Sequence, residues 1–368
     1  MSDFNPIYHL ALTCTPGIGC ITAKKLFDTL GSAEAVFQSS PKELRALFGK
    51  RARTIHAIEH RTMFEQCEKE LAFIEKHRLG LLCYGDVLFP NRLKNIPDPP
   101  MVLYTKGTPD LNSSKVIGMV GTRNATAYGR KVVDDILCSP TLEGTVIVSG
   151  LAYGIDAQAH RSALQNGLST IGILGHGLDM MYPAEHRSLA KDMIEQNGGL
   201  VTEFMSGTAM ARENFPQRNR IIAGLCDALI VVEASEKGGA LITANLAFDY
   251  NREVFAIPGR WGDNFSYGVN HLIKTNRAQM ITRPEDIGCF MNWQNEQVKK
   301  KTPTLFPNLT PEEQKIYDLL ISSEGCTVDE IRKGTNHTPS QIATLLLGME
   351  MDGVVSCQPG KIYKANKQ

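Results

Sequence analysis

The spacing of hydrophobic and polar positions divides the chain into three segments. In residues 1–78, apolar side chains recur every three or four positions, as in TMFEQCEKELAFIEKH, a spacing typical of amphipathic helices. In residues 79–292, short apolar runs alternate with helical patterns and glycine turns, which indicates βαβ units and a mainly parallel sheet. In residues 309–368, three short helical patterns precede a hairpin with a Pro-Gly turn, the outline of a winged helix.

Sharper signals mark where individual elements begin and end. Six apolar runs in the second segment predict its strands: VIGMV, TVIVS, STIGIL, LVTEF, ALIVVEA and EVFAIP. Ser40 before Pro41, and Thr310 three residues before Glu313, predict helix starts. Residues 293–308 contain two prolines and a lysine triplet without periodicity, so they are predicted to be a linker.

Composition narrows the class of protein. The chain has 368 residues, of which 42% are hydrophobic and 21% charged, which suits two or three domains with ample cores. It has no apolar stretch of about 18 residues, and MSDFNPIYHL lacks the pattern of a secretory signal. Nine cysteines without a C-x-x-C pair are typical of reduced thiols. We therefore predict a cytoplasmic protein that makes no membrane contact.

The charge balance restricts how nucleic acid could bind. The chain has 39 basic and 39 acidic residues, and the segment 79–292 alone has 19 and 21. A nucleic-acid-binding protein is usually basic. Any such binding must therefore depend on a local cluster of basic side chains.

The first candidate site is the turn in VIGMVGTRNATAYGRK, between a predicted strand and a predicted helix. Its glycines at 118, 121 and 129 do not match the G-x-G-x-x-G of a dinucleotide site. Helix starts at the carboxyl ends of parallel strands still favour anions, and Arg123 adds a fork for a phosphate. The alternative is a structural turn in which Arg123 pairs with a nearby carboxylate.

A second strand-to-helix turn lies in VSGLAYGIDAQAHRSAL. Gly150 and Gly154 permit close approach of the backbone, and Asp156 is placed to cap the following helix. The G-x-S-x-G of a nucleophile elbow is absent from this turn. The turn therefore predicts a binding edge and gives no sign of a catalytic serine.

The strongest basic cluster is in MARENFPQRNRIIAGL. Arg212, Arg218 and Arg220 lie within nine residues, with Phe215 among them. Basic side chains around an aromatic ring are typical of single-strand binding, because charge follows the backbone and the ring stacks a base. The alternative is a buried Phe215 with arginines in ion pairs.

A further strand-to-helix turn and two strand ends complete the candidates. EASEKGGALITA predicts another anion cradle at Gly238 and Gly239, with Lys237 beside it. Glu203 and Glu233 end predicted strands, where a carboxylate can act as an acid or base. Signatures of P-loops, kinases, zinc proteases and paired metal ligands are absent from the sequence, so neither metal nor cofactor is expected.

The two flanking segments carry weaker signals. CTPGIGCITAKKL is similar to one helix-hairpin-helix element, which can present backbone N–H groups to DNA or serve a structural role. The predicted recognition helix of the winged helix, TPSQIATLLLGMEMDG, has no lysine or arginine and two acids. Because phosphate neutralisation dominates DNA affinity, a protein contact is favoured there over duplex DNA.

Taken together, these motifs resemble the DNA-processing protein A (DprA, or Smf) family. The matching stretches span nearly all of residues 79–292 in family order: GMVGTRNATAYGR, VSGLAYGIDAQAHRSAL, GHGLDMMYP, FPQRNRIIAGL, VVEASEKGGALITA, REVFAIPGR and GVNHLIK. The resemblance implies an extended Rossmann-like, doubly wound sheet, flanked by an N-terminal all-α domain and a C-terminal winged helix. It also implies a bacterial protein that is not an enzyme.

The resemblance implies a function and a set of residues as well. The family binds and protects single-stranded DNA, loads the RecA recombinase during natural transformation, and forms a homodimer through the Rossmann-like domain. The residues that the resemblance and the turns assign to nucleic acid are Gly121, Arg123, Gly150, Arg212, Phe215, Arg218, Asn219, Lys237 and Gly238. Asn270 and Ile273 are assigned to the dimer or partner face. The chain departs from the family at Thr122, at Tyr153 and in the Gly-Gly-Ala after Lys237.

Two other functions stay open at this stage. Rossmann-like folds include hydrolases that cleave a base from a nucleoside phosphate, and Glu233 near a Gly-Gly turn fits such chemistry. The P-G-G-x-G-T motif of those hydrolases is absent from the sequence. The other alternative is an adaptor whose Rossmann-like domain senses a nucleotide while its winged helix binds a protein.

Overall fold

The computed structural model describes residues 5–49, 52–293, 309–323, 325–335 and 337–366. The predicted linker 293–308 lies outside the described residues except for Trp293. The chain divides into two compact units, Met1–Ile287 and Gly288–Gln368. The domain boundary expected at residue 78 falls inside the first unit and stays a prediction.

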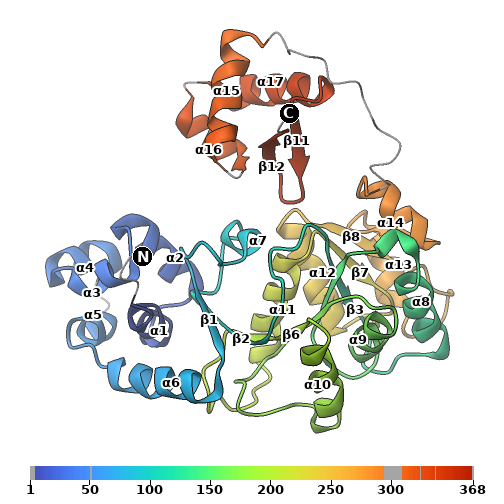
Figure 1. Ribbon diagram of the computed structural model, residues 1–368, viewed down its shortest axis with the longest axis horizontal. Coiled ribbons are helices and arrows are strands. Elements are labelled where there is room, and N and C mark those ends of the chain that lie inside the picture. Colours follow the sequence, from blue (N-terminus) through green and yellow to red (C-terminus); the bar gives the residue numbers. More distant parts are fainter. Residues whose placement is uncertain (1–4, 50–51, 294–308, 324, 336, 367–368) are drawn as a thin grey trace. The chain divides into compact units, whose positions relative to one another are not determined.

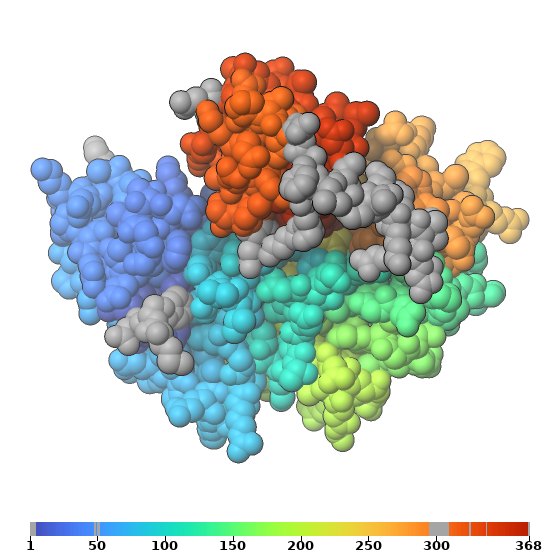
Figure 2. All heavy atoms as spheres, turned by 45° about the horizontal axis from the view of Figure 1, so that its top comes forward, coloured from blue at the N-terminus to red at the C-terminus, as the bar shows by residue number. Residues whose placement is uncertain are grey.

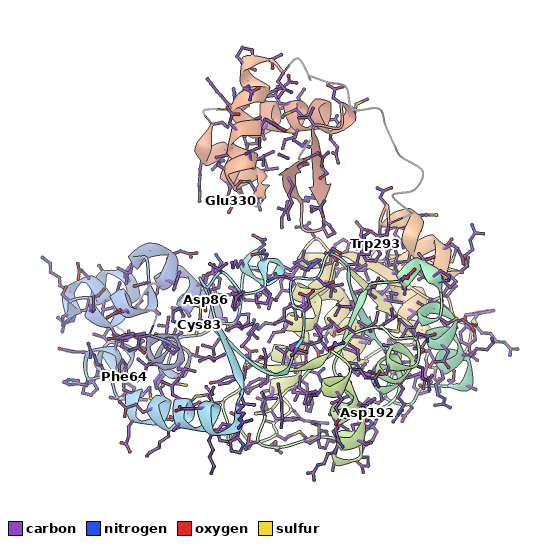
Figure 3. The ribbon with its side chains drawn as sticks, viewed as in Figure 1. Phe64, Cys83, Asp86, Asp192, Trp293 and Glu330 are labelled. Atoms are coloured by element: carbon purple, nitrogen blue, oxygen red, sulfur yellow. The ribbon has the colours of Figure 1, made fainter. Side chains whose placement is uncertain are left out.

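The first unit begins with six helices, drawn in blue in Figure 1. Ser40 accepts the Glu43 amide while the Glu43 carboxylate accepts the Ser40 amide, which confirms the predicted helix start. Phe64 (Figure 3) packs edge-on against Tyr8 and Phe37, with ring centroids 5.5 and 5.3 Å away. The six helices are α1 (Ile7–Cys14), α2 (Cys20–Leu30), α3 (Ala33–Gln38), α4 (Pro41–Phe48), α5 (Ala52–Glu59) and α6 (Phe64–His77).

A nine-stranded sheet follows, in the order β1-β2-β6-β5-β4-β3-β7-β8-β9. The pairs from β6 to β9 are all parallel, whereas β1–β2 and β2–β6 are antiparallel. The predicted α/β, mainly parallel sheet is therefore confirmed. The strands are β1 (Gly80–Cys83), β2 (Val102–Gly107), β3 (Val116–Val120), β4 (Val146–Ser149), β5 (Thr170–Ile173), β6 (Gly199–Thr202), β7 (Ala228–Val231), β8 (Glu253–Ala256) and β9 (Gln279–Met280).

A helix connects each parallel strand to the next, because a crossover between parallel strands needs a long connection. The long ones are α8 (Ala127–Leu137), α9 (Ile155–Gln165), α10 (Arg187–Glu195), α11 (Asn214–Leu225), α12 (Gly239–Asp249) and α13 (Tyr267–Lys274). Shorter ones are α7 (Asn91–Lys94), α14 (Pro284–Phe290) and the 3-10 turns Pro140–Leu142 and Ala184–His186. The central strands β3, β4, β5 and β7 are buried along their whole length, as expected when helices cover both faces.

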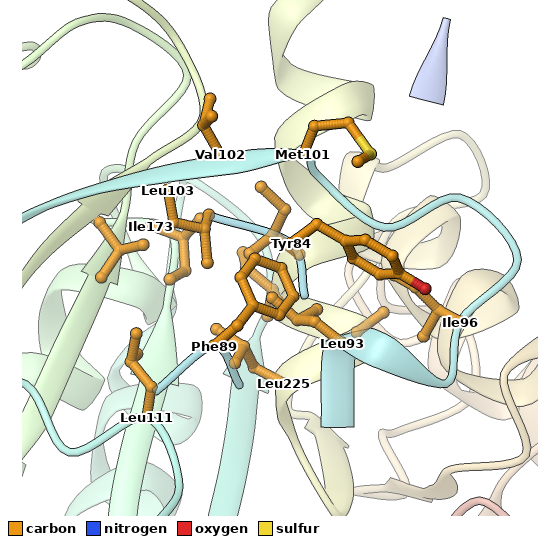
Figure 4. Close-up of a cluster of buried hydrophobic side chains, with 14 of the residues drawn as sticks. Tyr84, Phe89, Leu93, Ile96, Met101, Val102, Leu103, Leu111, Ile173 and Leu225 are labelled. Atoms are coloured by element: carbon orange, nitrogen blue, oxygen red, sulfur yellow. The ribbon is translucent and has the colours of Figure 1, made fainter. Parts of the chain in front are cut away.

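One hydrophobic core joins the N-terminal helices to the sheet. It includes Leu10 of α1, Leu26 of α2 and Val148 of β4. Figure 4 shows Tyr84 and Phe89 at its centre, and Figure 2 shows the blue helical segment beside the cyan segment that contains them. Their rings are 5.6 Å apart. Because burial of such side chains drives folding, residues 5–287 form one packed body.

The second unit is a winged helix with its own core. Thr310 and Glu313 form the predicted capping box at the start of the first helix. The strands form a separate sheet in the order β10-β12-β11. The elements are α15 (Pro311–Ser322), β10 (Cys326–Thr327), α16 (Val328–Gly334), α17 (Pro339–Met351), β11 (Val355–Gln358) and β12 (Ile362–Ala365). In the described part of the chain, no helix is both long and apolar enough to span a bilayer.

Candidate functional site

The site lies where the strand order reverses. The chain runs outward from β3 through β4 and β5 to β6, then returns to β7 on the other side of β3. Loops after β3 and β7 diverge at this point and leave a crevice at the carboxyl ends of the strands. A cavity of about 330 Å³ occupies it, and the residues lining it are Val120, Gly121, Thr122, Arg123, Asn124, Ala152, Asp156, Phe215, Arg218, Asn219, Ile222, Ala234, Ser235, Gly238, Gly239, Ala240, Thr243 and Phe265.

The turn after β3 forms one wall of the cavity. Gly121 is required there, because a Cβ at this position would lie 2.5 Å from the Ile155 side chain. The Thr122 amide donates to the Glu233 carbonyl at 2.8 Å, which fixes the turn to the end of β7. Arg123 is exposed, and its guanidinium lies 5.3 Å from the centre of the Phe215 ring. The turn therefore presents a charged group to solvent from a fixed backbone.

Arg218 enters the same cavity from α11. Its side chain is buried and lies against Gly150, where a Cβ would stand only 1.5 Å from its Nη1 atom. Burial lowers the pKa of the Arg218 guanidinium to about 10, while Asp156 raises it and Arg123 lowers it further. At neutral pH the group is charged. Its Nε is buried and has no hydrogen-bond partner among the described residues.

Asp156 opposes the charge of Arg218 only in part. The Gly150 amide donates to its carboxylate at 3.2 Å. Burial raises the pKa of the Asp156 carboxyl, and the nearby Arg218 acts in the opposite direction. The charged residues that line the cavity are Arg123, Arg218 and Asp156, so the lining carries one net positive charge when all three are ionised.

The Phe215 ring lies close to the guanidinium groups of both arginines. The Arg218 guanidinium is 5.9 Å from its ring centre, close to the 5.3 Å of Arg123. The half-buried ring also borders a smaller cavity that includes Gly150 and Tyr153. The predicted alternative, a Phe215 buried in the core with the arginines of the cluster in ion pairs, holds for Arg220, which pairs with Glu203, but not for the half-buried Phe215.

The opposite wall is the start of α12. Gly238 is its N-cap, and no side chain caps the helix. Gly238, Gly239 and Ala240 line the cavity. The amide groups at a helix start carry a partial positive charge and favour anions. The Gly-Gly turn therefore borders the same cavity as Arg123, and its role as an anion cradle stays a prediction.

The other predicted residues lie outside the cavity lining. Arg212 is exposed just before α11, and Lys237 is exposed in the turn before α12. Asn270 exchanges two hydrogen bonds with the Gly259 backbone, at 3.1 and 2.9 Å. Ile273 is half-buried on α13 and packs against the core. Gly150 was predicted to bind nucleic acid. In the structure it makes room for the Arg218 side chain.

Arg220 was counted in the basic cluster, but it faces the other side of α11. It forms a buried ion pair with Glu203 and donates to the Cys20 thiol at 3.2 Å and to the Asp98 carbonyl. It borders a separate cavity of about 840 Å³ between the N-terminal helices and the sheet. Its charge is thus used to hold the fold together.

The two carboxylates proposed for acid–base chemistry are both engaged. Glu233 accepts hydrogen bonds from the Thr126 amide at 3.0 Å and from the Thr126 hydroxyl, and so holds the residue that caps α8. Glu203 is paired with Arg220, and burial raises the pKa of its carboxyl while Arg220 lowers it. Among the described residues, no group of three His, Cys, Asp or Glu side chains is arranged to hold a metal ion.

Sequence reasoning missed several lining residues. Ser235, Thr243 and Phe265 contribute hydroxyl groups and a ring to the cavity. Ser235 and Thr243 lie next to the Gly-Gly turn, so the strand–turn–helix pattern could have identified them. Phe265 lies in a loop after β8, and nothing in its local sequence marks it.

Comparison with known proteins now identifies the family. A family model described as DNA recombination-mediator protein A matches residues 80–292, and one described as DprA winged helix domain matches residues 300–361. The chain belongs to the DprA family. A curated DprA-family relative, Protein Smf of Synechocystis sp., is 32% identical over 99% of this chain and 100% of its own length. DNA processing protein DprA of Streptococcus pneumoniae is 42% identical over 55% of this chain and 71% of its own length.

Solved DprA structures share this fold. The X-ray structure of DprA from S. pneumoniae aligns with a TM-score of 0.67 and 33% identity, over 77% of this chain and 97% of that one. DprA from Helicobacter pylori aligns with a TM-score of 0.52 and 28% identity, over 58% and 96%. The latter structure is described as showing a single-stranded DNA binding mode of that protein.

Proposed function

We propose that this protein is a recombination mediator that binds and protects single-stranded DNA and loads RecA onto it during natural transformation. The observation that carries the proposal is the cavity at the strand-order reversal, which Phe215, Arg123 and Arg218 line together. Guanidinium groups neutralise phosphates, and an aromatic ring stacks a base of any sequence. The single-strand binding described for the H. pylori relative supports the same assignment.

Within this proposal the cavity residues have separate roles. Arg123 and Arg218 hold phosphate, and the amides at the start of α12 hold a second oxygen. Phe215 stacks a base, and Asn219 supplies an amide that can bond to a base or phosphate. Arg212 and Lys237, which are exposed beside the cavity, lie on the path of the strand as it leaves. Thr122 replaces the family serine and keeps a hydroxyl at that position.

The assembly is part of the proposal. The protein forms a homodimer through the sheet domain, with Ile273 on the face that meets the second copy or RecA. The winged helix contacts a protein, since α17 has no basic residue and exposes Leu347 and Met351 one turn apart. A cytoplasmic location agrees with nine cysteines that are all described and all free. The protein acts by binding, without chemistry of its own.

Oligo-dT binding at one fixed salt concentration tests the site. We expect Arg123→Ala to weaken binding by about 10- to 150-fold, because a hydrogen bond to a charged group is worth roughly 1.5–3 kcal/mol. Arg212→Ala should have a smaller effect. Arg161→Ala removes an exposed arginine of α9 outside the cavity lining and is the matched control.

Two results would contradict the proposal at different levels. Unchanged affinity in both Arg123→Ala and Arg212→Ala would remove the site assignment. Failure of the unaltered protein to bind single-stranded DNA, or to speed RecA filament assembly on it, would remove the function. Genuine strand binding should also weaken by about 0.7 log units per phosphate contact for each log unit of salt.

A further inference from the structure

The loop between β8 and α13 forms an extension of the cavity edge. β8 is two positions from β3 in the sheet, so this loop starts about 10 Å along the edge from the Arg123 turn. Phe265, near its end, lines the cavity. A strand that leaves the cavity on the α12 side therefore meets this loop.

The loop is held at both ends. Its first part is fixed by the two hydrogen bonds between Asn270 and Gly259. Its last part is fixed where the Ala234 amide donates to the Phe265 carbonyl at 2.7 Å. Tyr128, in the first turn of α8 after the Arg123 turn, donates its hydroxyl to the Pro258 carbonyl at 3.3 Å. These bonds connect the loop directly to the elements that build the cavity.

Trp261 stands at the tip of this loop with its ring in solvent. The Asp263 amide donates to the Arg260 carbonyl at 3.2 Å and closes a tight turn. Gly262 has φ +93°, the value that the third residue of a type II turn requires. Trp261 occupies the second position of the turn and is 98% exposed. No other large hydrophobic side chain in the described part of the chain is as exposed.

The surroundings of Trp261 combine aromatic rings with one basic and one acidic side chain, Arg260 and Asp263, in the same turn. Tyr128 and Tyr267, at the two sides of the loop, are also more than half exposed. Arg260 is the exposed neighbour of Trp261 in the turn. An exposed indole leaves a large apolar surface in water, which a stacking partner would cover. Exposed rings beside an arginine on a fixed loop are features of a single-strand stacking platform.

We propose that Trp261 stacks on a base of the bound strand outside the cavity, while Arg260 neutralises the phosphate next to that base. The proposal rests on the proposed function and extends the binding site from the Phe215 cavity to a second platform. The ligand is a stretch of single-stranded DNA long enough to reach both rings. Stacking makes this platform indifferent to base identity, because every base offers a π-face.

The chain offers a direct optical test, since its two tryptophans are Trp261 and Trp293. In Trp293→Phe protein, Trp261 is the sole tryptophan, and its emission should be quenched when oligo-dT binds. A strand of the same length with abasic sites in place of bases should bind more weakly and quench far less. Bound oligo-dT with unchanged Trp261 emission would overturn the stacking proposal and leave the proposed function standing.

Affinity measurements provide a second test of the stacking proposal. Trp261→Ala should weaken oligo-dT binding by about 5- to 150-fold, the loss expected for one stacked base. Trp261→Phe should restore most of this affinity, and Trp261→Leu should not, because leucine has no ring. Trp293→Ala is the control and should bind as the unaltered protein does.

Two further outcomes separate this proposal from its rivals. Trp261 emission that changes with protein concentration, and does not change with DNA, would assign the ring to a contact between two copies and overturn stacking. Absence of oligo-dT binding by the unaltered protein would instead remove the proposed function itself.

Discussion

Arg218 and Arg220, two residues apart on α11, lie on opposite faces of the helix and border different cavities. Arg218 lies in a cavity with one opposing carboxylate, Asp156, and a second arginine, Arg123. Arg220 forms a closed ion pair with Glu203, and both side chains are more than nine-tenths buried. Residues i and i+2 of a helix point about 200° apart around its axis. Two arginines of one basic cluster in the sequence can therefore face different environments.

The difference teaches what makes positive charge available to a ligand. On the Arg220 side the carboxylates of Glu203 and Asp98 border the same cavity as the guanidinium, so its charge is cancelled locally. They raise the pKa of Arg220, against the effect of burial. On the Arg218 side the two guanidinium groups exceed the one carboxylate. The local excess of positive over negative side chains, and not the number of arginines in the sequence cluster, marks the candidate site.

The largest expected effect comes from breaking the closed pair. Arg220→Met would leave the Glu203 carboxylate buried without its partner and should lower the free energy of unfolding by about 3–5 kcal/mol. Urea unfolding measures this change. The oligo-dT affinity of the folded variant should be unchanged, because Arg220 does not line the Phe215 cavity.

A double substitution provides the control for this experiment. Adding Glu203→Gln to Arg220→Met removes the buried charge and should recover part of the lost stability. A loss of stability below about 1 kcal/mol in Arg220→Met, or a fall in its DNA affinity, would show that the two faces are not separated as described.

A smaller effect is expected from one methyl group on the cavity side. Gly150→Ala would place a Cβ where the Arg218 guanidinium now lies and force that group to move. We expect a loss of about 1–3 kcal/mol in stability and a clear loss of oligo-dT affinity, although no charge is removed. Urea unfolding and anisotropy titration measure the two changes.

Gly19→Ala is the matched control, because a Cβ at Gly19 meets no atom within 4 Å and its φ of −97° suits alanine. Gly19 borders the cavity on the Arg220 side. Because Gly19 is the N-cap of α2, Gly19→Ala should cost about 1 kcal/mol in stability but leave the oligo-dT affinity unchanged. Normal DNA binding by Gly150→Ala would mean that Arg218 does not hold DNA from its present position.

The smallest expected effect is at the rim. Lys237 is exposed and outside the cavity lining, so Lys237→Ala should change the slope of log affinity against log salt by at most about 0.7, one phosphate contact. Lys191→Ala, an exposed lysine of α10 that pairs with Glu195, is the comparison. An affinity loss greater than tenfold would place Lys237 inside the binding site.

Periodicity and turn chemistry predict most of the sheet. All six predicted apolar runs contain strands, β3 to β8, because each is a buried strand bounded by glycine turns. β1 and β2 were not predicted. They pair antiparallel at the sheet edge, without the strand–glycine–helix pattern that marked the others. β9 has two residues, too few to show a period.

The candidate site could be predicted in part. Arg123, Phe215, Arg218, Asn219 and the glycines at 121 and 238 do meet in one cavity. The sequence could not separate Arg218 from Arg220, because that distinction depends on which carboxylate each meets after folding. It could not show that Gly150 serves Arg218, because the two are 68 positions apart and touch only across the loops.

The shared core of the N-terminal helices and the sheet has a consequence for how this chain can change over time. Phe27 of α2 packs edge-on against Tyr84, at 5.2 Å between ring centres, and the His9 ring bonds to the Tyr84 carbonyl. A descendant that lost the first 78 residues would expose Tyr84 and its neighbours to water. Such a loss would require compensating polar substitutions along β1, because water would otherwise reach the side chains that the N-terminal helices now cover.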